Sequence, residues 1–408
     1  MYIKSIKIND LKDITKSPQR VTDFLGNPSK QQANSPVRED NEQLIEIEEL
    51  LKKIEEAPLP AVLKDKANKM IQRLNRMAKF GSYSGEYELI EKYIDWIVSI
   101  PWGKYSKDNL DLENARDVLD RNHYGLNSVK DRVLEFLAVA RLNPFDNIRL
   151  EEEGYEAMKT MKKVGQHAPI LCFVGIQGIG KTSMAKSIAH ALGKQFVRIS
   201  LGAMGSVTDL KGQSRAFLDA EPGQVVKSLT RTKVMNPLIL LDEIDKVSAA
   251  EGRRADINAA LLEILDPEQN PSFVDSYIDF PIDLSRVLFI CTGNTLSTLS
   301  AALLDRLEII RFPSYTDEEK EKIAKHYLLP KVIKACGLRQ DQIEINESVW
   351  PLIIRPLGFD AGVRQLERNI TTVCRKVARN IVEGRGDRFL ITPENFREYL
   401  PADIGVYS

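Results

Sequence analysis

Residues 169–191 constrain the fold more than any other stretch of this sequence. The continuous apolar run Ile170–Val174 predicts a short strand buried on both faces. The motif Gly175-x-x-x-x-Gly180-Lys181-Thr182 follows at once, and a helical pattern comes after it. Strand, glycine-rich loop and helix in this order predict a site that binds the phosphates of a nucleotide.

Each residue type in this loop suits phosphate chemistry. Glycines let backbone N–H groups approach an anion, and the following helix points the positive end of its dipole at the same place. Lys181 supplies a point charge for the β- and γ-phosphates, and the Thr182 hydroxyl is a ligand for Mg²⁺. The residues expected to bind the nucleotide here are Gly175, Ile176, Gln177, Gly178, Ile179, Gly180, Lys181, Thr182 and Ser183.

A second strand brings carboxylates to the same edge of the predicted sheet. The apolar residues 238–241 predict a buried strand, and Asp242 and Glu243 emerge at its carboxyl end, where ligands bind in an open parallel sheet. Asp242 is placed to hold the Mg²⁺ that Thr182 also touches. Glu243 is placed to accept a proton from the attacking water or to orient it.

Two later stretches add polar groups near this edge. The strand 287–294 ends in Asn294, which is placed to complete the geometry that holds the water, and Arg306 comes just before the next strand. An arginine there is able to neutralise a γ-phosphate on its own subunit or on a neighbour. There is no Asn-Lys-x-Asp for guanine, which argues against a switch GTPase.

Length and composition bound the function classes. A chain of 408 residues predicts two or three domains, and a net charge of −1 argues against a mainly electrostatic nucleic-acid binder. The sequence shows neither an export leader nor an apolar run long enough to span a membrane. Four widely spaced cysteines and four scattered histidines predict a reduced, cytoplasmic protein without structural zinc.

The fold class expected is α/β, with a parallel sheet flanked by helices and an all-α lid. We expect a flexible arm over 1–40, opening with a short strand near residues 2–8, and a helical region over 41–110. There, two apolar stripes separated at 57–60 fit either two helices with a proline joint or a coiled coil. The nucleotide-binding domain is expected over 111–313, the lid over 314–400 and a tail over 401–408. In the lid, Pro330 should break or kink a helix, and a final helix should begin at Thr392.

The turn-rich residues 202–223 carry one large apolar pair, Phe217-Leu218. From the residues alone, this pair is either tucked under a neighbouring element or presented to a partner.

Taken together, these motifs resemble the ATPase module of Lon proteases. The likeness runs from about residue 42 almost to the C-terminus, and the most specific stretch is 261–270, which ends in Asp-Pro-Glu-Gln-Asn. The other stretches that carry it are 93–96, 100–103, 123–126, 175–182, 241–245, 303–306 and 361–368.

The resemblance implies an AAA+ ring ATPase, usually a hexamer, that grips unfolded protein and threads it through a central pore. It implies ATP and Mg²⁺ as cofactors, with Lys181 and Thr182 on phosphate and metal, Asp242 supporting the metal and Glu243 activating water. It further implies Asn294 as γ-phosphate sensor, Arg306 as a finger reaching a neighbouring subunit, Arg364 as the nucleotide-sensing lid arginine, Tyr124-Gly125 as adenine-pocket lining, and Phe217-Leu218 as the pore-loop pair.

The sequence departs from the Lon pattern in three places. Ile176-Gln177 replaces a pair of prolines, and the pore pair carries Phe217 in place of tyrosine, followed by Asp219-Ala220-Glu221. No counterpart of the Ser-Lys peptidase dyad is found, so this chain is not expected to cut peptide bonds by itself. The function expected is protein unfolding and translocation, as part of a protease or as a stand-alone chaperone. The rival hypotheses are an AAA+ motor on nucleic acid and a nucleotide-regulated scaffold.

Overall fold

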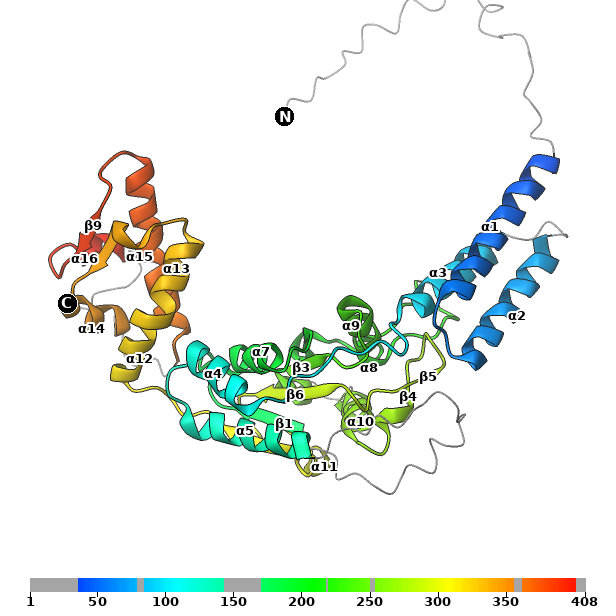
Figure 1. Ribbon diagram of the computed structural model, residues 1–408, viewed down its shortest axis with the longest axis horizontal. Helices are drawn as coiled ribbons and strands as arrows, with labels where there is room; N and C mark the ends of the chain where they lie inside the picture. The colour runs from blue at the N-terminus through cyan, green and yellow to red at the C-terminus, as the bar shows by residue number, and fades with distance from the viewer. Residues whose placement is uncertain are drawn as a thin grey trace, which may run out of the picture.

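Three bodies follow one another in the computed structural model: an N-terminal helical bundle, a central α/β domain and a C-terminal lid (Figure 1). The structure describes residues 36–78, 84–142, 170–217, 219–249, 254–355 and 362–400. The expected strand near residues 2–8, most of the expected arm and Leu218 lie outside these ranges. The domain boundaries drawn from the sequence stay predictions.

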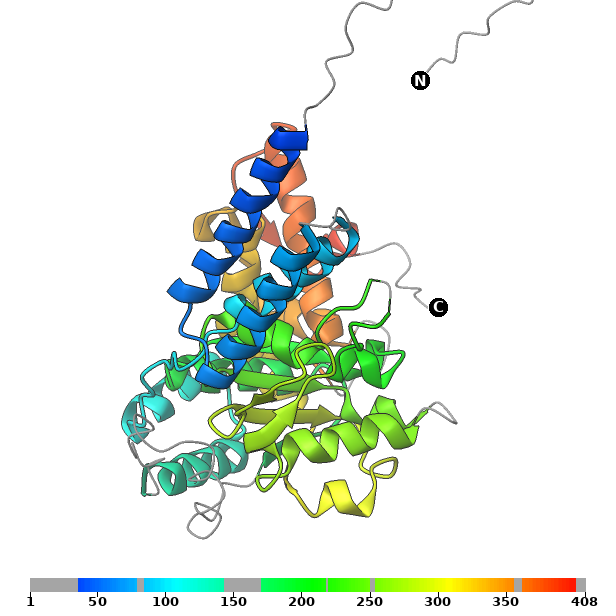
Figure 2. The ribbon, with the colours of Figure 1, turned by 90° about the vertical axis from the view of Figure 1, so that its right-hand side faces the viewer.

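The N-terminal bundle consists of α1 (Pro36–Glu56), α2 (Ala61–Ala78) and α3 (Ser84–Ser99). Helix α1 begins at Pro36, within the segment expected to be an arm. α1 and α2 lie side by side, separated by the proline-containing joint at 57–60, and α3 packs against both (Figure 2). Both apolar stripes therefore face one core that α3 shares. The structure thus shows two helices with a proline joint, packed in a bundle with α3. The fully buried members of this core include Ile47, Leu50, Ile54, Leu63, Leu74, Tyr93 and Ile97.

A five-stranded parallel sheet of order β2-β3-β6-β1-β7 forms the centre of the α/β domain. Its strands are β1 (Ile170–Val174), β2 (Phe196–Ser200), β3 (Leu238–Asp242), β6 (Leu288–Gly293) and β7 (Leu307–Arg311). Alternate residues enter two cores: Cys172 and Leu241 face the same core as the bundle, whereas Phe173 and Leu240 face the core shared with the lid. The sheet is therefore buried on both faces, as its apolar strands predict.

Helices cover both faces of the sheet. On the lid side lie α4 (Leu112–Asn122), α5 (Asn127–Leu142) and α7 (Lys181–Ala191). On the bundle side lie α8 (Val207–Lys211), α9 (Gln224–Thr232), α10 (Arg254–Leu265) and α11 (Ala301–Leu304), with the hairpin of β4 (Phe273–Val274) and β5 (Pro281–Ile282). Short 3₁₀ turns occupy Leu201–Ala203, Ile244–Ala249, Asn270–Ser272, Gln340–Gln342 and Glu347–Val349.

The lid is helical but contains one small sheet. Its helices are α12 (Asp317–Ile323), α13 (Leu329–Ala335), α14 (Trp350–Ile354), α15 (Arg364–Val382) and α16 (Phe396–Tyr399). Strands β8 (Ile343–Ile345) and β9 (Phe389–Ile391) pair in parallel, which the sequence analysis did not anticipate. The final helix begins at Phe396, because residues 393–395 form a turn in place of the expected helix start at Thr392.

The α-helical run around Pro330 is interrupted directly before the proline. A π-helical turn, η5 (Ala324–Leu328), joins α12 to α13 immediately before it. The proline then lies in the first turn of α13, where a missing N–H is tolerated.

The cysteines that the sequence placed in apolar strands are buried. Cys172 and Cys291 are free thiols inside the sheet, and burial raises the pKa of Cys172 to about 12. None of the helices in the described ranges is both long and apolar enough to cross a membrane.

Candidate active site

A cavity of about 750 Å³ lies at the carboxyl edge of the sheet, between the phosphate loop and the lid. Four parts of the chain bound it: the end of α4, the phosphate loop with the start of α7, the ends of β3 and β6, and lid residues such as Tyr327. The residues predicted from the sequence that line it are Tyr124, Gln177, Gly178, Ile179, Gly180, Lys181, Thr182, Ser183, Asp242, Glu243, Asn294 and Arg364. The described lining leaves out Gly125, Gly175, Ile176 and Arg306.

The phosphate loop turns tightly between β1 and α7. Gly178 and Gly180 adopt φ values of +81° and +97°, which residues other than glycine rarely adopt. The Lys181 ammonium donates to the carbonyls of Gly175 and Ile176 and, at 3.0 Å, to Asn294 Oδ1. Burial lowers the pKa of Lys181, and the neighbouring carboxylates oppose that shift.

The lid touches the loop through backbone. The Val363 N–H donates to the Gly178 carbonyl at 3.0 Å, at the start of α15. A Cβ on Gly178 would lie 2.9 Å from the Arg364 Cβ, and one on Gly362 would lie 2.6 Å from the Gln177 carbonyl oxygen. These two glycines allow the lid to approach, and they bring Arg364 to the cavity wall.

Thr292 connects the Asp242 carboxylate to the backbone of Glu243. Its hydroxyl donates to Asp242 Oδ1 and accepts from the Glu243 N–H at 3.2 Å. The other carboxylate oxygen of Asp242 pairs with Arg198 Nε at 2.6 Å. Glu243 has a φ of +62° and its carboxylate pairs with Lys246 at 2.8 Å. The end of β3 is therefore held in one geometry by β2 and β6, its two neighbours in the sheet.

A histidine supports the far end of the cavity. His123 Nε2 lies 2.9 Å from Ser187 Oγ on α7, and the Lys130 ammonium donates to the His123 carbonyl at 2.7 Å. Burial, aided by the positive charge of Lys130, lowers the pKa of His123 to about 4. The ring is thus neutral at physiological pH, and it fixes the backbone that leads into Tyr124.

Arg306 lies away from this cavity and is anchored elsewhere. Its guanidinium pairs with Asp266 Oδ2 at 2.9 Å and donates to the Ala302 carbonyl at 2.8 Å. Burial acts to raise the pKa of Asp266, but hydrogen bonds from the Glu268 N–H, Arg306 and Gln269 lower it overall. Arg306 is therefore held by an ionised carboxylate at a surface separate from its own chain's cavity.

The predicted pore residue Phe217 is exposed, with 59% of its surface accessible. It lies in the loop between α8 and α9. Of the two carboxylates that depart from the Lon pattern, Glu221 pairs with Lys227 at 2.7 Å, and this hydrogen bond lowers its pKa. Its negative charge is therefore partly neutralised beside the loop.

Sequence reasoning missed three residues that shape the site, Arg198, Thr292 and His123. It also missed Asp266, which anchors Arg306 outside the cavity. Arg198 was visible as a charged residue inside an apolar strand, and Thr292 as a hydroxyl inside another. What they contact depends on the order β2-β3-β6, which the sequence pattern alone does not give.

Comparison with known proteins adds two family matches. Residues 171–315 match the ATPase family associated with various cellular activities (AAA), and residues 334–389 match the Lon protease AAA+ ATPase lid domain. The Lon protease 2 of Thermus thermophilus is 45% identical over 362 residues, which cover 89% of this chain and 43% of that protein. The Lon protease of Geobacter metallireducens is 43% identical over 355 residues, covering 87% and 40%.

The chain thus spans about two fifths of the length of the curated relatives that it matches. Both family matches fall on bodies described above, the α/β domain and its helical lid. On the fold, the site geometry and these matches, the chain is a Lon-like AAA+ ATPase module.

Proposed function

We propose that this chain binds ATP with Mg²⁺, hydrolyses it within a ring of subunits and uses the energy to unfold and thread protein substrates. The observation that carries the proposal is the meeting of Lys181, Asp242, Glu243, Asn294 and Arg364 at one cavity. They come from the phosphate loop, two strand ends and the lid, and a cavity of about 750 Å³ accommodates a nucleotide.

The residues present fit a magnesium ion. The Thr182 hydroxyl and the Asp242 carboxylate line the same cavity and are hard oxygen donors of the kind that Mg²⁺ prefers. Arg198, which pairs with Asp242, has a half-exposed side chain, so water can solvate its guanidinium when the ion takes over the carboxylate. When bound, the ion would neutralise charge on the β- and γ-phosphates.

Glu243 is the proposed base. Its carboxylate lies one residue beyond the metal-binding Asp242 and lines the cavity, where it is placed to accept a proton from the attacking water. The Lys181–Asn294 contact couples the phosphate-binding lysine to the proposed γ-phosphate sensor. Tyr124 and its chain neighbour Gly125 would contact the adenine, and Arg364 would report nucleotide to the lid.

A ring is needed because Arg306 lies outside its own chain's cavity. An arginine that completes hydrolysis from a neighbouring subunit explains both its distance from the site and its anchoring by Asp266. We propose a homo-hexamer, by likeness to AAA+ rings, with Phe217 and Leu218 presented to polypeptide in the pore. The proposal holds for a protease motor and for a chaperone alike, since both require threading. We also propose that the protein acts in the cytoplasm.

The test uses the substitution Glu243→Gln, which removes the base and keeps the size of the side chain. We expect wild-type ATPase activity to rise on addition of unfolded casein. The variant should bind ATP normally but turn it over at least about 100-fold more slowly. An ATPase that casein leaves unchanged, and that double-stranded DNA stimulates in a salt-dependent way, would overturn the threading function in favour of a nucleic-acid motor.

A further inference from the structure

The loop that carries Phe217, residues 213–222, has a closed stem. The Gln213 N–H donates to the Glu221 carbonyl at 3.1 Å, which pairs the two sides. A Cβ on Gly223 would lie 2.1 Å from the Leu210 carbonyl oxygen, so the backbones of the two chain segments that flank the loop are in direct contact. The loop therefore leaves the domain as one narrow projection.

Asp275 ties this stem to the turn 275–279, between β4 and β5. Its buried carboxylate accepts the Gly223 N–H at 2.8 Å from the stem. It also accepts the Tyr277 N–H at 2.8 Å and the Ile278 N–H at 3.1 Å within the turn. A second tie runs from the Ser276 N–H to the Lys211 carbonyl at 2.7 Å.

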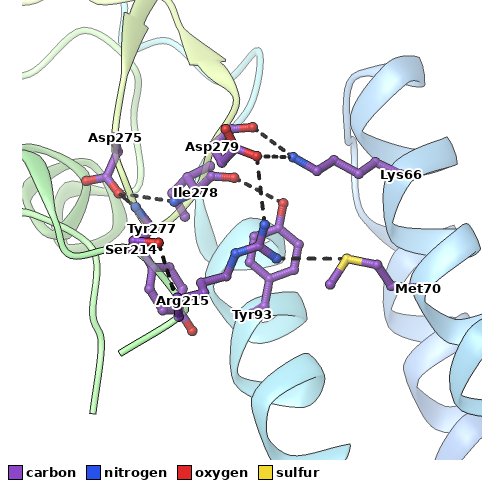
Figure 3. A network of polar contacts seen from close by, with 10 residues as sticks. Lys66, Met70, Tyr93, Ser214, Arg215, Asp275, Tyr277, Ile278 and Asp279 are labelled. Atoms are coloured by element: carbon purple, nitrogen blue, oxygen red, sulfur yellow. Dashed lines mark hydrogen bonds and ion pairs between the residues drawn. The ribbon is translucent and has the colours of Figure 1, made fainter. Parts of the chain in front are cut away.

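The N-terminal bundle holds the other side of the same turn (Figure 3). Tyr93 of α3, fully buried, donates its hydroxyl to the Ile278 carbonyl at 3.1 Å. Lys66 of α2 donates to the Asp279 carboxylate at 2.7 Å and to its carbonyl at 2.9 Å. The turn thus lies between the bundle and the stem of the loop.

One residue makes the connection direct. Arg215 lies in the loop itself, two residues before Phe217, and its guanidinium stands 4.0 Å from the centre of the Tyr93 ring. It also lies 3.9 Å from Asp279 and 4.0 Å from the Met70 sulfur of α2, as Figure 3 shows. A planar guanidinium over a buried aromatic face is a stronger and more directional contact than a surface ion pair.

We infer that Arg215 is a positioning residue through which the α1–α3 bundle fixes the Phe217 loop. The bundle acts as a brace: a load applied at Phe217 passes through Arg215 and Tyr93 into a packed helical core instead of bending the stem. This inference rests on the proposed function, in which Phe217 contacts a threaded polypeptide. It assigns a mechanical role to the bundle, which has no part in the nucleotide cavity as the structure describes it.

The test compares Arg215→Met with Arg286→Met in the full chain. Arg286 stands 4.6 Å from the Tyr105 ring in the same kind of contact, but away from the loop stem, so it is the matched control. We expect Arg215→Met to speed amide hydrogen exchange in the peptide 213–222 by about fivefold and the control to leave it unchanged. Tyr93→Phe, which keeps the ring and removes the hydroxyl bond to Ile278, should have a smaller effect.

Casein-stimulated ATPase activity supplies the second readout. Arg215→Met should keep basal turnover and lose most of the stimulation, a split that general destabilisation would not produce. If Phe217→Ala leaves stimulation intact, the proposed function fails. If Phe217→Ala abolishes stimulation while Arg215→Met matches wild type in exchange and stimulation, the proposed function stands and the brace is refuted.

Discussion

The burial of single ionisable residues sets how the stability of this protein responds to pH, and His123 is the sharpest case. Its folded pKa of about 4 lies below the ordinary 6.5, so the unfolded chain takes up a proton that the folded chain refuses. The free energy of unfolding is thus unaffected by this group above pH 6.5 and falls as pH drops toward 4. Between pH 6.5 and 5 we expect a loss of about 2 kcal/mol.

Urea unfolding at several pH values from 7 to 5 measures this loss. His123→Gln, which keeps a polar group near Ser187 but has no proton to gain in this range, should flatten the slope by that amount. His190→Gln changes an exposed histidine of α7 and serves as the control. An unchanged slope in His123→Gln would show that the ring is not held neutral.

The same scale shows what the sequence can and cannot predict. Lys181, Asp242 and Asn294 meet because each stands at the carboxyl edge of a parallel sheet, a rule that applies before the strand order is known. Arg198 contacts Asp242 only because β2 lies next to β3, and Asp266 meets Arg306 only through the packing of α10 and α11. Such contacts depend on the tertiary arrangement of distant segments, which leaves no local pattern in the sequence.

At the scale of elements, the contact between phosphate loop and lid is the most informative. Gly178 combines a φ of +81° with a Cβ position 2.9 Å from the Arg364 Cβ. Alanine there meets both backbone strain and the lid, so we expect Gly178→Ala to weaken ATP affinity by about tenfold. Isothermal titration calorimetry measures the ATP affinity directly when both proteins also carry Glu243→Gln, so that ATP is not hydrolysed during the titration.

Gly337 provides the control for this prediction. It has a similar φ of +71°, at the end of α13, but a Cβ there meets nothing within 4 Å. Gly337→Ala therefore carries the strain without the clash and should leave ATP affinity within about twofold of wild type. Equal affinities in the two variants would mean that the lid contact does not support nucleotide binding.

Elements were predicted well where the pattern is local and poorly where pairing is distant. The apolar stripe over 363–381 by itself predicts a helix, and α15 occupies that stretch. The sequence Thr316-x-x-Glu319 by itself predicts a helix start, and these two residues form the capping box that begins α12. Strands β8 and β9 are three residues each and lie 43 residues apart, so no turn or alternation announces their pairing. At Pro330 the sequence predicted an interruption of the helix but not its form, which is a π-helical turn between α12 and α13.

At the scale of the whole molecule, the sheet separates two cores with different partners. One face shares its core with the α1–α3 bundle, and the other shares it with the lid. The strand pattern predicted a sheet covered on both faces, but which body covers which face follows from packing over long sequence distances. The candidate nucleotide cavity is therefore lined by lid residues, whereas Arg215 of the Phe217 loop contacts Tyr93 of the bundle.

Subunit mixing tests whether Arg306 acts on a neighbouring subunit. Glu243→Gln lacks the base but keeps the arginine, and Arg306→Ala keeps the base but lacks the arginine, so each ring alone should be nearly inactive. In a mixed ring, some interfaces join an intact Glu243 to an intact Arg306 of the next subunit. For random equimolar assembly we expect about a quarter of wild-type ATPase activity to return.

The control mixes Arg306→Ala with the double variant Glu243→Gln/Arg306→Ala, in which no subunit supplies the arginine. That mixture should stay inactive, because every site lacks its partner whatever the arrangement of subunits. Recovery is expected only when the subunits associate, so it should fall on dilution together with the ring measured by size-exclusion chromatography. If the first mixture stays as inactive as the control while rings form, Arg306 does not act between subunits, and its pairing with Asp266 is structural.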